Sequence, residues 1–79
     1  MNNIEYKRVI ISEEIKVRDY LISFLQQEFS YVAQRKSIRF NNGIISVGLP
    51  PLIKKRLLSL QEKVVDGLKK EGVNILKIV

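Results

Sequence analysis

The chain contains neither cysteine nor histidine. The absence of cysteine excludes disulfide bonds, thiolate zinc sites and cysteine nucleophiles, and it suits a reducing compartment. The absence of histidine removes the most common general acid–base group. Glu62 and Asp66 share a helix face, but Lys70 follows Asp66 by four residues, which favours an ion pair over a metal site. We therefore expect a protein without catalytic residues, cofactor or metal.

Long hydrophobic runs are also missing. No stretch approaches the roughly 18 apolar residues that a membrane span needs. Near the N-terminus, Glu5, Lys7 and Arg8 interrupt the apolar residues before a signal-peptide core can form. These features predict a cytoplasmic protein that has no membrane partner.

What is present is the composition of a small globular domain. The 79 residues are 46% hydrophobic and 28% charged, which is too apolar for a disordered tail. A domain this small buries only about 60% of the surface of its unfolded chain, so it has no room for a deep cleft. Because the chain contains no linker, repeat or low-complexity segment, we expect residues 1–79 to form a single domain.

Acidic residues are absent from the middle third of the chain, between Glu28 and Glu62. The basic residues of this window are Arg35, Lys36, Arg39, Lys54, Lys55 and Arg56. The other eight of the 14 basic residues balance the eight acidic ones, so the whole net charge of +6 arises from the window. A surplus concentrated in this way produces a local positive potential.

Two patterns predict the first elements of the fold. Residues 4–11 are rich in β-branched and aromatic side chains, which favours a β-strand. Ser12, followed by two glutamates, is typical of a helix N-terminus. The next apolar residues recur at helical spacing, and they are Val17, Leu21, Phe24, Leu25 and Val32. We therefore predict a strand over 4–11 and a helix from about residue 13 to between Phe29 and Ala33.

The pair Asn42-Gly43 predicts a β-hairpin, because both central residues of a type I′ turn adopt positive φ. With this turn, the cross-strand pairs are Phe40 with Ile45, Ile38 with Val47, and Arg39 with Ser46. The first two pairs are apolar and share one face, whereas the third lies on the other face. The predicted register is therefore self-consistent.

A proline pair predicts the start of a second helix. Proline is tolerated in the first turn of a helix, so Pro50-Pro51 indicates a helix over about 51–70, and Gly72 is a natural stop. Its predicted buried stripe is Ile53, Leu57, Leu60, Val64 and Leu68. A glycine inside a helix lowers stability by about 1 kcal/mol relative to alanine. The presence of Gly67 inside the predicted helix therefore indicates that a neighbouring element packs closely against it. Residues 73–79 are predicted to form a final strand.

The predicted order of elements is strand, helix, hairpin, helix, strand. This order is typical of an α+β domain with helices on one face of a mostly antiparallel sheet. If both terminal strands join the sheet, the arrangement is ferredoxin-like. If the first strand does not join, the remaining elements resemble the KH type of arrangement.

Three of the basic residues, Lys54, Lys55 and Arg56, are predicted near the start of the second helix, where positive charge opposes the helix dipole. This placement favours a phosphate-binding site, and the alternative is an ordinary solvated helix face. Hairpin pairing places Lys36 opposite Leu49, next to the same helix start. We therefore predict that the two groups of cations form one continuous patch that binds nucleic acid. The alternative is that these residues are ordinary surface charge.

Base recognition has little support in the sequence. Phe24 and Phe40 are assigned to the core, so no aromatic platform for stacking bases is evident. The GxxG loop that clamps nucleotides in most KH domains is missing, since Gly43 and Gly48 are five residues apart. The patch is therefore expected to contact phosphates without reading sequence.

In the second half of the chain, a turn ending in glycine is followed by a strand of alternating aliphatics, a leucine-bearing helix and a short terminal strand. The residues that carry this pattern are Asn42-Gly43-Ile44-Ile45 with Val47, then Leu57, Leu60 and Leu68, then Val73, Leu76 and Ile78. From about Arg39 to Val79, half of its length, the chain thus resembles the DciA family of bacterial replicative-helicase operators. The resemblance implies a KH-like domain that contacts DNA through basic residues and works beside the replicative helicase. On this sequence that role falls to the six cations of the middle third.

Two functions follow as hypotheses. The first is a non-enzymatic nucleic-acid-binding module, with DNA favoured over RNA and a replicative helicase as a protein partner. The second is a protein-interaction or assembly module, in which exposed strand edges, or a mixed face such as Ile44 and Ser46, bind a partner or a second copy of the chain.

Overall fold

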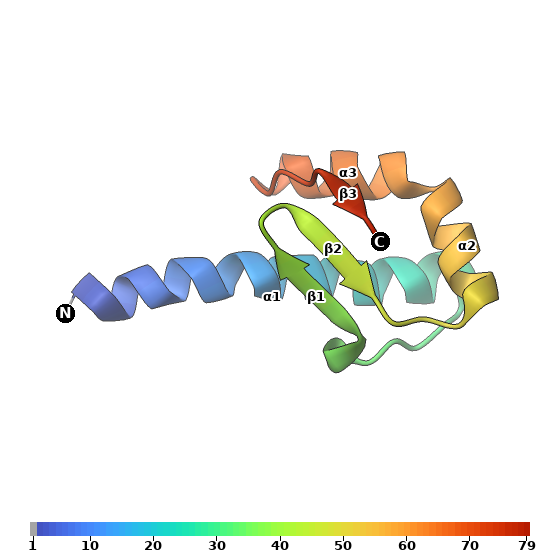
Figure 1. Ribbon diagram of the computed structural model, residues 1–79, viewed down its shortest axis with the longest axis horizontal. Helices are drawn as coiled ribbons and strands as arrows, with labels where there is room; N and C mark the ends of the chain where they lie inside the picture. The colour runs from blue at the N-terminus through green and yellow to red at the C-terminus, as the bar shows by residue number, and fades with distance from the viewer. Residues whose placement is uncertain (1) are drawn as a thin grey trace.

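The computed structural model describes the backbone of residues 2–79 and the side chains of residues 13–79. In chain order the elements are α1 (Asn2–Phe29), a 3₁₀ turn η1 (Arg35–Ser37), β1 (Ile38–Asn41), β2 (Ile44–Val47), α2 (Pro51–Ser59), α3 (Gln61–Lys70) and β3 (Lys77–Ile78). Figure 1 shows the sheet packed against one side of α1, with α3 alongside and α2 closing one end. The predicted α+β class is confirmed.

The strand predicted over residues 4–11 is wrong, because these residues belong to α1. A β-branched segment is stable as a strand only where another strand pairs with it, and the described strands form one sheet of order β1-β2-β3 that excludes this segment. In contrast, a helix that has already formed over residues 13–29 gains one hydrogen bond for each residue added. Ser12 is accordingly inside α1 and does not cap it.

The order that remains is helix, hairpin, helices, strand. The N-terminal segment does not join the sheet, and two helices stand where a single one was predicted after the hairpin. The ferredoxin-like arrangement is excluded over the described residues, because it needs a strand before the first helix. The N-terminal part of α1 extends beyond the sheet (Figure 1).

The C-terminal half of α1 forms one wall of the core. Val17, Leu21 and Leu25 have no exposed surface. The helix ends at Phe29, within the predicted range, and Ser30 follows with a φ of 52° and donates its backbone N–H to the Gln26 carbonyl oxygen at 2.9 Å. Val32, predicted on the apolar helix face, lies beyond this end and is 73% exposed.

The hairpin has the predicted register. Ile38 pairs with Val47, Arg39 with Ser46, and Phe40 with Ile45. Asn42 and Gly43 have φ values of 51° and 79°, as a type I′ turn requires. The side chains of Ile38, Ile45 and Val47 are buried against the helices, and Phe40 is half-buried.

The last strand is shorter than predicted and makes the sheet mixed. Only Lys77–Ile78 form β3, which pairs parallel to β2 through Ile44 with Lys77 and Ile45 with Ile78. The residues before β3 form no strand, and two of them, Val73 and Ile75, are buried in the core.

The single helix predicted over 51–70 is wrong, because the chain turns a corner at Leu60, whose φ and ψ are −110° and 19°. The Ser59 hydroxyl donates to the Arg56 carbonyl oxygen at 2.6 Å, which offers that carbonyl an alternative to an intrahelical partner. The corner lets both helices face the core: Leu57 of α2, and Val64 and Leu68 of α3, are fully buried.

The crossing of α1 and α3 confirms the close packing predicted at Gly67. A Cβ atom on Gly67 would lie 2.5 Å from the Cζ atom of Tyr20, which is shorter than any real contact. The Tyr20 hydroxyl donates to the Lys63 carbonyl oxygen at 3.5 Å. Burial, and secondly the Glu71 carboxylate, raise the pKa of Tyr20 above its ordinary value. None of the described helices is both long and apolar enough to cross a membrane.

Candidate nucleic-acid interface

Two of the six predicted cations meet at one end of the hairpin. The η1 turn places Lys36 directly before β1, and strand alternation turns Arg39 away from the core. Together with Ser37, Ser46 and other residues they line a hollow of about 260 Å³. Both side chains are exposed, and neither forms an ion pair with any side chain of residues 13–79. We call Lys36 and Arg39 the hairpin group.

Arg35 is directed elsewhere. Its guanidinium forms an ion pair with the Asp19 carboxylate of α1 at 3.2 Å, and the two side chains are 66% and 53% exposed. An ion pair at this exposure contributes about 0–1 kcal/mol and is screened by salt. Arg35 therefore adds less free positive charge than Lys36 and Arg39 do.

The remaining three cations lie on α2, and we call Lys54, Lys55 and Arg56 the helix group. Lys55 and Arg56 are exposed, whereas Lys54 is half-buried and its backbone N–H bonds to the Pro50 carbonyl oxygen at 2.9 Å. Because α2 ends at Ser59, Arg56 lies in its last turn, where positive charge is favourable. The predicted conflict with the helix dipole therefore does not hold for Arg56.

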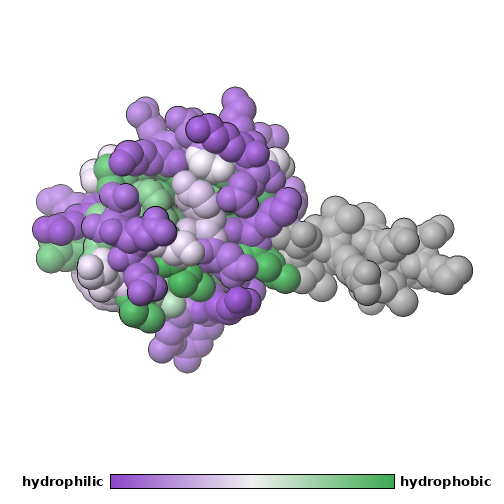
Figure 2. All heavy atoms as spheres, turned by 180° about the vertical axis from the view of Figure 1, so that it is seen from behind, coloured by the Kyte–Doolittle hydropathy of each residue, from purple (hydrophilic) through white to green (hydrophobic). Residues whose placement is uncertain are grey.

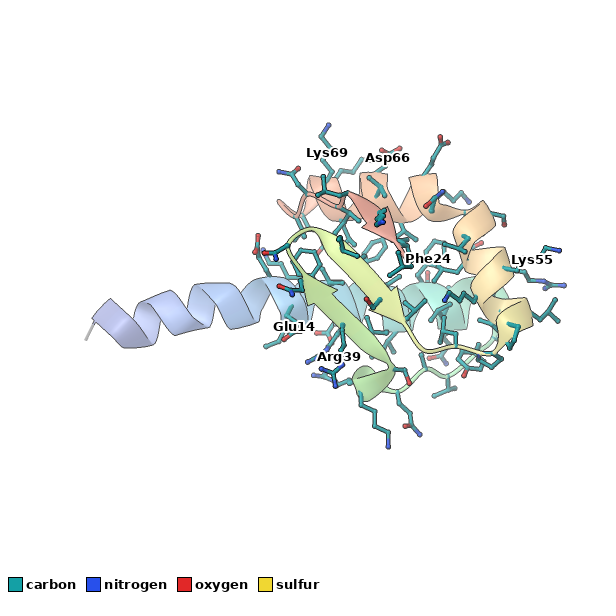
Figure 3. All side chains as sticks on the ribbon, in the orientation of Figure 1. Glu14, Phe24, Arg39, Lys55, Asp66 and Lys69 are labelled. Carbon is teal, nitrogen blue, oxygen red and sulfur yellow. The ribbon has the colours of Figure 1, made fainter. Side chains whose placement is uncertain are left out.

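The predicted single patch is divided in the structure. Figure 3 shows Arg39 on the β1 side of the molecule, whereas Lys55 points outward from α2 at the opposite side of the view. The loop of residues 48–50 leads from the hairpin to α2, which holds the helix group at the end of the molecule that this helix closes (Figure 1). The structure thus brings Lys36 and Arg39 together and separates them from the helix group.

The sheet has one face that no helix covers (Figure 1). Strand alternation and the strand registers place on it two rows of residues. The first row is Arg39, Ser46 and Val79, whose backbone continues the pairing of β3 with β2, and the second is Asn41, Ile44 and Lys77. We call these six residues the open sheet face; none is acidic. Lys77 was missed by the sequence analysis, although its position next to the buried Ile78 indicates an outward side chain.

The turn end of the hairpin has the opposite electrostatic character. A second hollow, of about 380 Å³, is lined there by Glu13, Glu14, Asn42, Asn74 and other residues. Glu14 also pairs with the Arg18 guanidinium at 3.4 Å. The η1 end of the hairpin therefore carries basic side chains, and its turn end faces acidic ones.

The acidic residues of α3 form neither an ion pair nor a metal site among the described side chains. Asp66 forms no ion pair within the described side chains, so the predicted pair with Lys70 is not made. Among the same residues no three potential metal ligands are grouped. Figure 2 shows the side opposite the open sheet face, which is largely hydrophilic with scattered apolar residues.

Comparison with known proteins gives no relative for this chain. No protein-family model, no curated protein and no solved structure matches it. The likeness to the DciA family therefore stays a hypothesis that depends on the residues quoted for it.

Proposed function

We propose that this protein is a non-enzymatic nucleic-acid-binding module that holds the phosphate backbone of DNA in preference to RNA, and that it acts beside a replicative helicase. The observation that carries the proposal is the hairpin group. Lys36 and Arg39 share one hollow with two serine hydroxyls, and neither has an acidic partner among the described side chains. Cations and hydroxyls are the groups that most often contact phosphate oxygens.

The separation of the two cationic groups is compatible with one long polyanion. The molecule measures 22 Å and 20 Å along its two shorter axes. A DNA strand presents one phosphate per roughly 3.4 Å of helix axis, so roughly six phosphates span that width. A strand held at the hairpin group can therefore reach other cations on the same molecule, whereas a single small phosphate compound cannot.

Charge reversal tests the proposal with matched variants. Lys36→Glu with Arg39→Glu alters the hairpin group, Lys55→Glu with Arg56→Glu alters the exposed part of the helix group, and Lys69→Glu with Lys70→Glu alters α3 as the control. Each double variant reverses two charges on exposed side chains. We expect the hairpin variant to weaken oligonucleotide binding at least about tenfold, measured by fluorescence polarisation, and the control by much less.

Equal losses in all three variants would mean that only net charge matters, and the proposed interface would be wrong. Circular dichroism of each variant must show an unchanged spectrum, because an unfolded variant would lose binding whether or not its charged residues contact the oligonucleotide. The helix variant reports separately whether α2 contributes.

Assembly through strand edges has less support in the structure. Arg18 donates from Nε to the Ile38 carbonyl oxygen at 2.9 Å, which occupies part of the outer edge of β1. The other edge strand, β3, is only two residues long. Light scattering across protein concentration tests this alternative: a salt-independent dimer that does not bind oligonucleotides would replace the proposal.

A further inference from the structure

We propose that the ligand is single-stranded nucleic acid and that it lies across the open sheet face, with phosphates on the cations and bases against Ile44. This inference depends on the proposed function and names its substrate. It starts from the arrangement of the six residues of the open sheet face, which combines cations, apolar side chains and hydrogen-bonding groups without an acidic side chain.

The cations occupy opposite corners of this face. Arg39 lies on β1 in the row of Ser46, and Lys77 lies on β3 in the row of Ile44. Neighbouring strands are about 4.8 Å apart and alternate residues of a strand about 6.6 Å apart, so the two Cα atoms lie roughly 12 Å apart across the sheet. If one phosphate contacts Arg39 and another contacts Lys77, the nucleotides between them lie over the central strand of the face.

The central strand of the face contributes one apolar residue, Ile44, and one polar residue, Ser46. Ile44 is half-buried between Asn41 and Lys77, and Val79, next to Ser46, is 42% exposed. Apolar surface removed from water by a base contributes favourable free energy, and apolar side chains serve as contacts for unstacked bases. The Asn41 amide and the Ser46 hydroxyl can donate to and accept from base edges. This combination fits a strand whose bases are free.

A duplex fits the same face poorly. Its bases are stacked inside, and the major groove is only about 12 Å wide. The sheet is backed by α1 in a body at least 20 Å across, so the open face cannot enter the groove. A duplex could offer only phosphates to Arg39 and Lys77, and Ile44 would gain no contact.

The hollow at the η1 end fixes where the strand enters. Lys36 and Arg39 line it with the Ser46 hydroxyl, and Arg39 and Ser46 also belong to the open sheet face. At the turn end, Glu13 and Glu14 line the second hollow together with Asn41, the β1 member of the row of Lys77. The strand is therefore expected to cross the face diagonally, from the hairpin group on β1 to Lys77 on β3, and to avoid the corner at Asn41.

The test compares three fluorescent oligonucleotides with the full chain: a 20-nucleotide single strand, its duplex, and a strand of equal length in which every nucleotide is abasic. Abasic sites keep the phosphates and remove the bases. We expect the single strand to bind at least about fivefold more tightly than the abasic strand, because only the intact strand can remove the apolar surface of Ile44 from water. The duplex is expected to bind more weakly than the single strand.

Two matched pairs of variants locate the contact. Lys77→Glu should weaken single-strand binding more than Lys63→Glu, which reverses one charge on α3. Ile44→Ser should reduce the preference for the strand with bases, whereas Ile15→Ser, at an exposed apolar position of α1, should not. The preference is a ratio of two affinities, so partial loss of folded protein in Ile44→Ser does not change it.

The outcomes separate this inference from the proposed function. If the duplex or the abasic strand binds as tightly as the intact single strand, and binding still depends on Lys36 and Arg39, the inference is overturned and the proposed function stands. If neither single strand nor duplex binds, both are overturned.

Discussion

At the scale of single residues, two glycines are required for different physical reasons. Gly72 has a φ of +86°, and a Cβ atom there would meet nothing within 4 Å. The N–H groups of Gly72 and Val73 bond to the carbonyl oxygens of Lys69 and Leu68 at 3.0 and 2.9 Å, which is the Schellman pattern at a helix end. The cost of a side chain at Gly72 is therefore purely conformational.

We predict that Gly72→Ala lowers the free energy of unfolding by about 1 kcal/mol, because an L-residue in the left-handed region is strained. Urea denaturation measures the change. Gly48→Ala is the control, since Gly48 has no positive φ and the nearest atom to an added Cβ is the Ser37 carbonyl oxygen at 3.8 Å. A Gly72→Ala variant as stable as the control would refute the conformational account.

Gly67 is required by packing. Alanine there would gain about 1 kcal/mol of helix propensity, but its Cβ would overlap the Tyr20 ring. Because overpacking typically costs about 1–3 kcal/mol, we predict net destabilisation of the wild-type chain by Gly67→Ala. In a Tyr20→Ala background the same substitution should become neutral or stabilising. Urea denaturation of the four variants gives the coupling, and stabilisation in both backgrounds would show that the Tyr20 ring moves aside at little cost and that packing does not require glycine here.

At the scale of elements, Arg18 joins α1 to the first strand. Its Nε donates to the Ile38 carbonyl oxygen at 2.9 Å and its guanidinium pairs with Glu14 at 3.4 Å. Arg18→Met keeps most of the side-chain volume and leaves the carbonyl oxygen unpaired, so we predict a loss of about 1–2 kcal/mol in urea denaturation. Lys16→Met, which removes only an exposed bond to the Glu71 carbonyl oxygen, should cost much less. Equal effects would mean that Arg18 does not hold the strand.

Elements set by local chemistry could be predicted from the sequence. The hairpin register follows from the φ requirement of Asn42-Gly43 and from the apolar pairs beside it, and the helix end at Gly72 follows from a positive φ. Elements set by tertiary context could not. Residues 4–11 have strand propensity but no strand to pair with, and Leu60 has helical neighbours on both sides yet forms a corner.

The candidate site also has a part that local chemistry determines and a part that tertiary contacts determine. Lys36 and Arg39 meet because the locally determined hairpin brings them together. The helix group was expected beside them, but the direction of α2 depends on how Leu57 packs in the core, which is a tertiary contact that no local pattern specifies. Lys77 enters the open sheet face only through parallel pairing with Ile44, a long-range contact that no local pattern specifies.

At the scale of the whole molecule, the charge is uneven in space as well as in sequence. The η1 end of the hairpin carries Lys36 and Arg39, and the turn end faces Glu13 and Glu14. Chain-wide net charge of +6 would attract any polyanion weakly, but only a localised group gives a defined number of phosphate contacts. The number of contacts is measurable, because each one releases condensed counterions.

The most direct test of this account is the slope of log affinity against log salt concentration for a single-stranded oligonucleotide. The slope is about −0.7 for each phosphate neutralised on a single strand. Replacing both Lys36 and Arg39 by glutamine removes two such contacts, so the slope should become less steep by about 1.4. Lys69→Gln with Lys70→Gln should leave the slope nearly unchanged. Identical slopes in the wild type and the Lys36→Gln, Arg39→Gln variant would contradict the claim that the hairpin group binds the phosphate backbone.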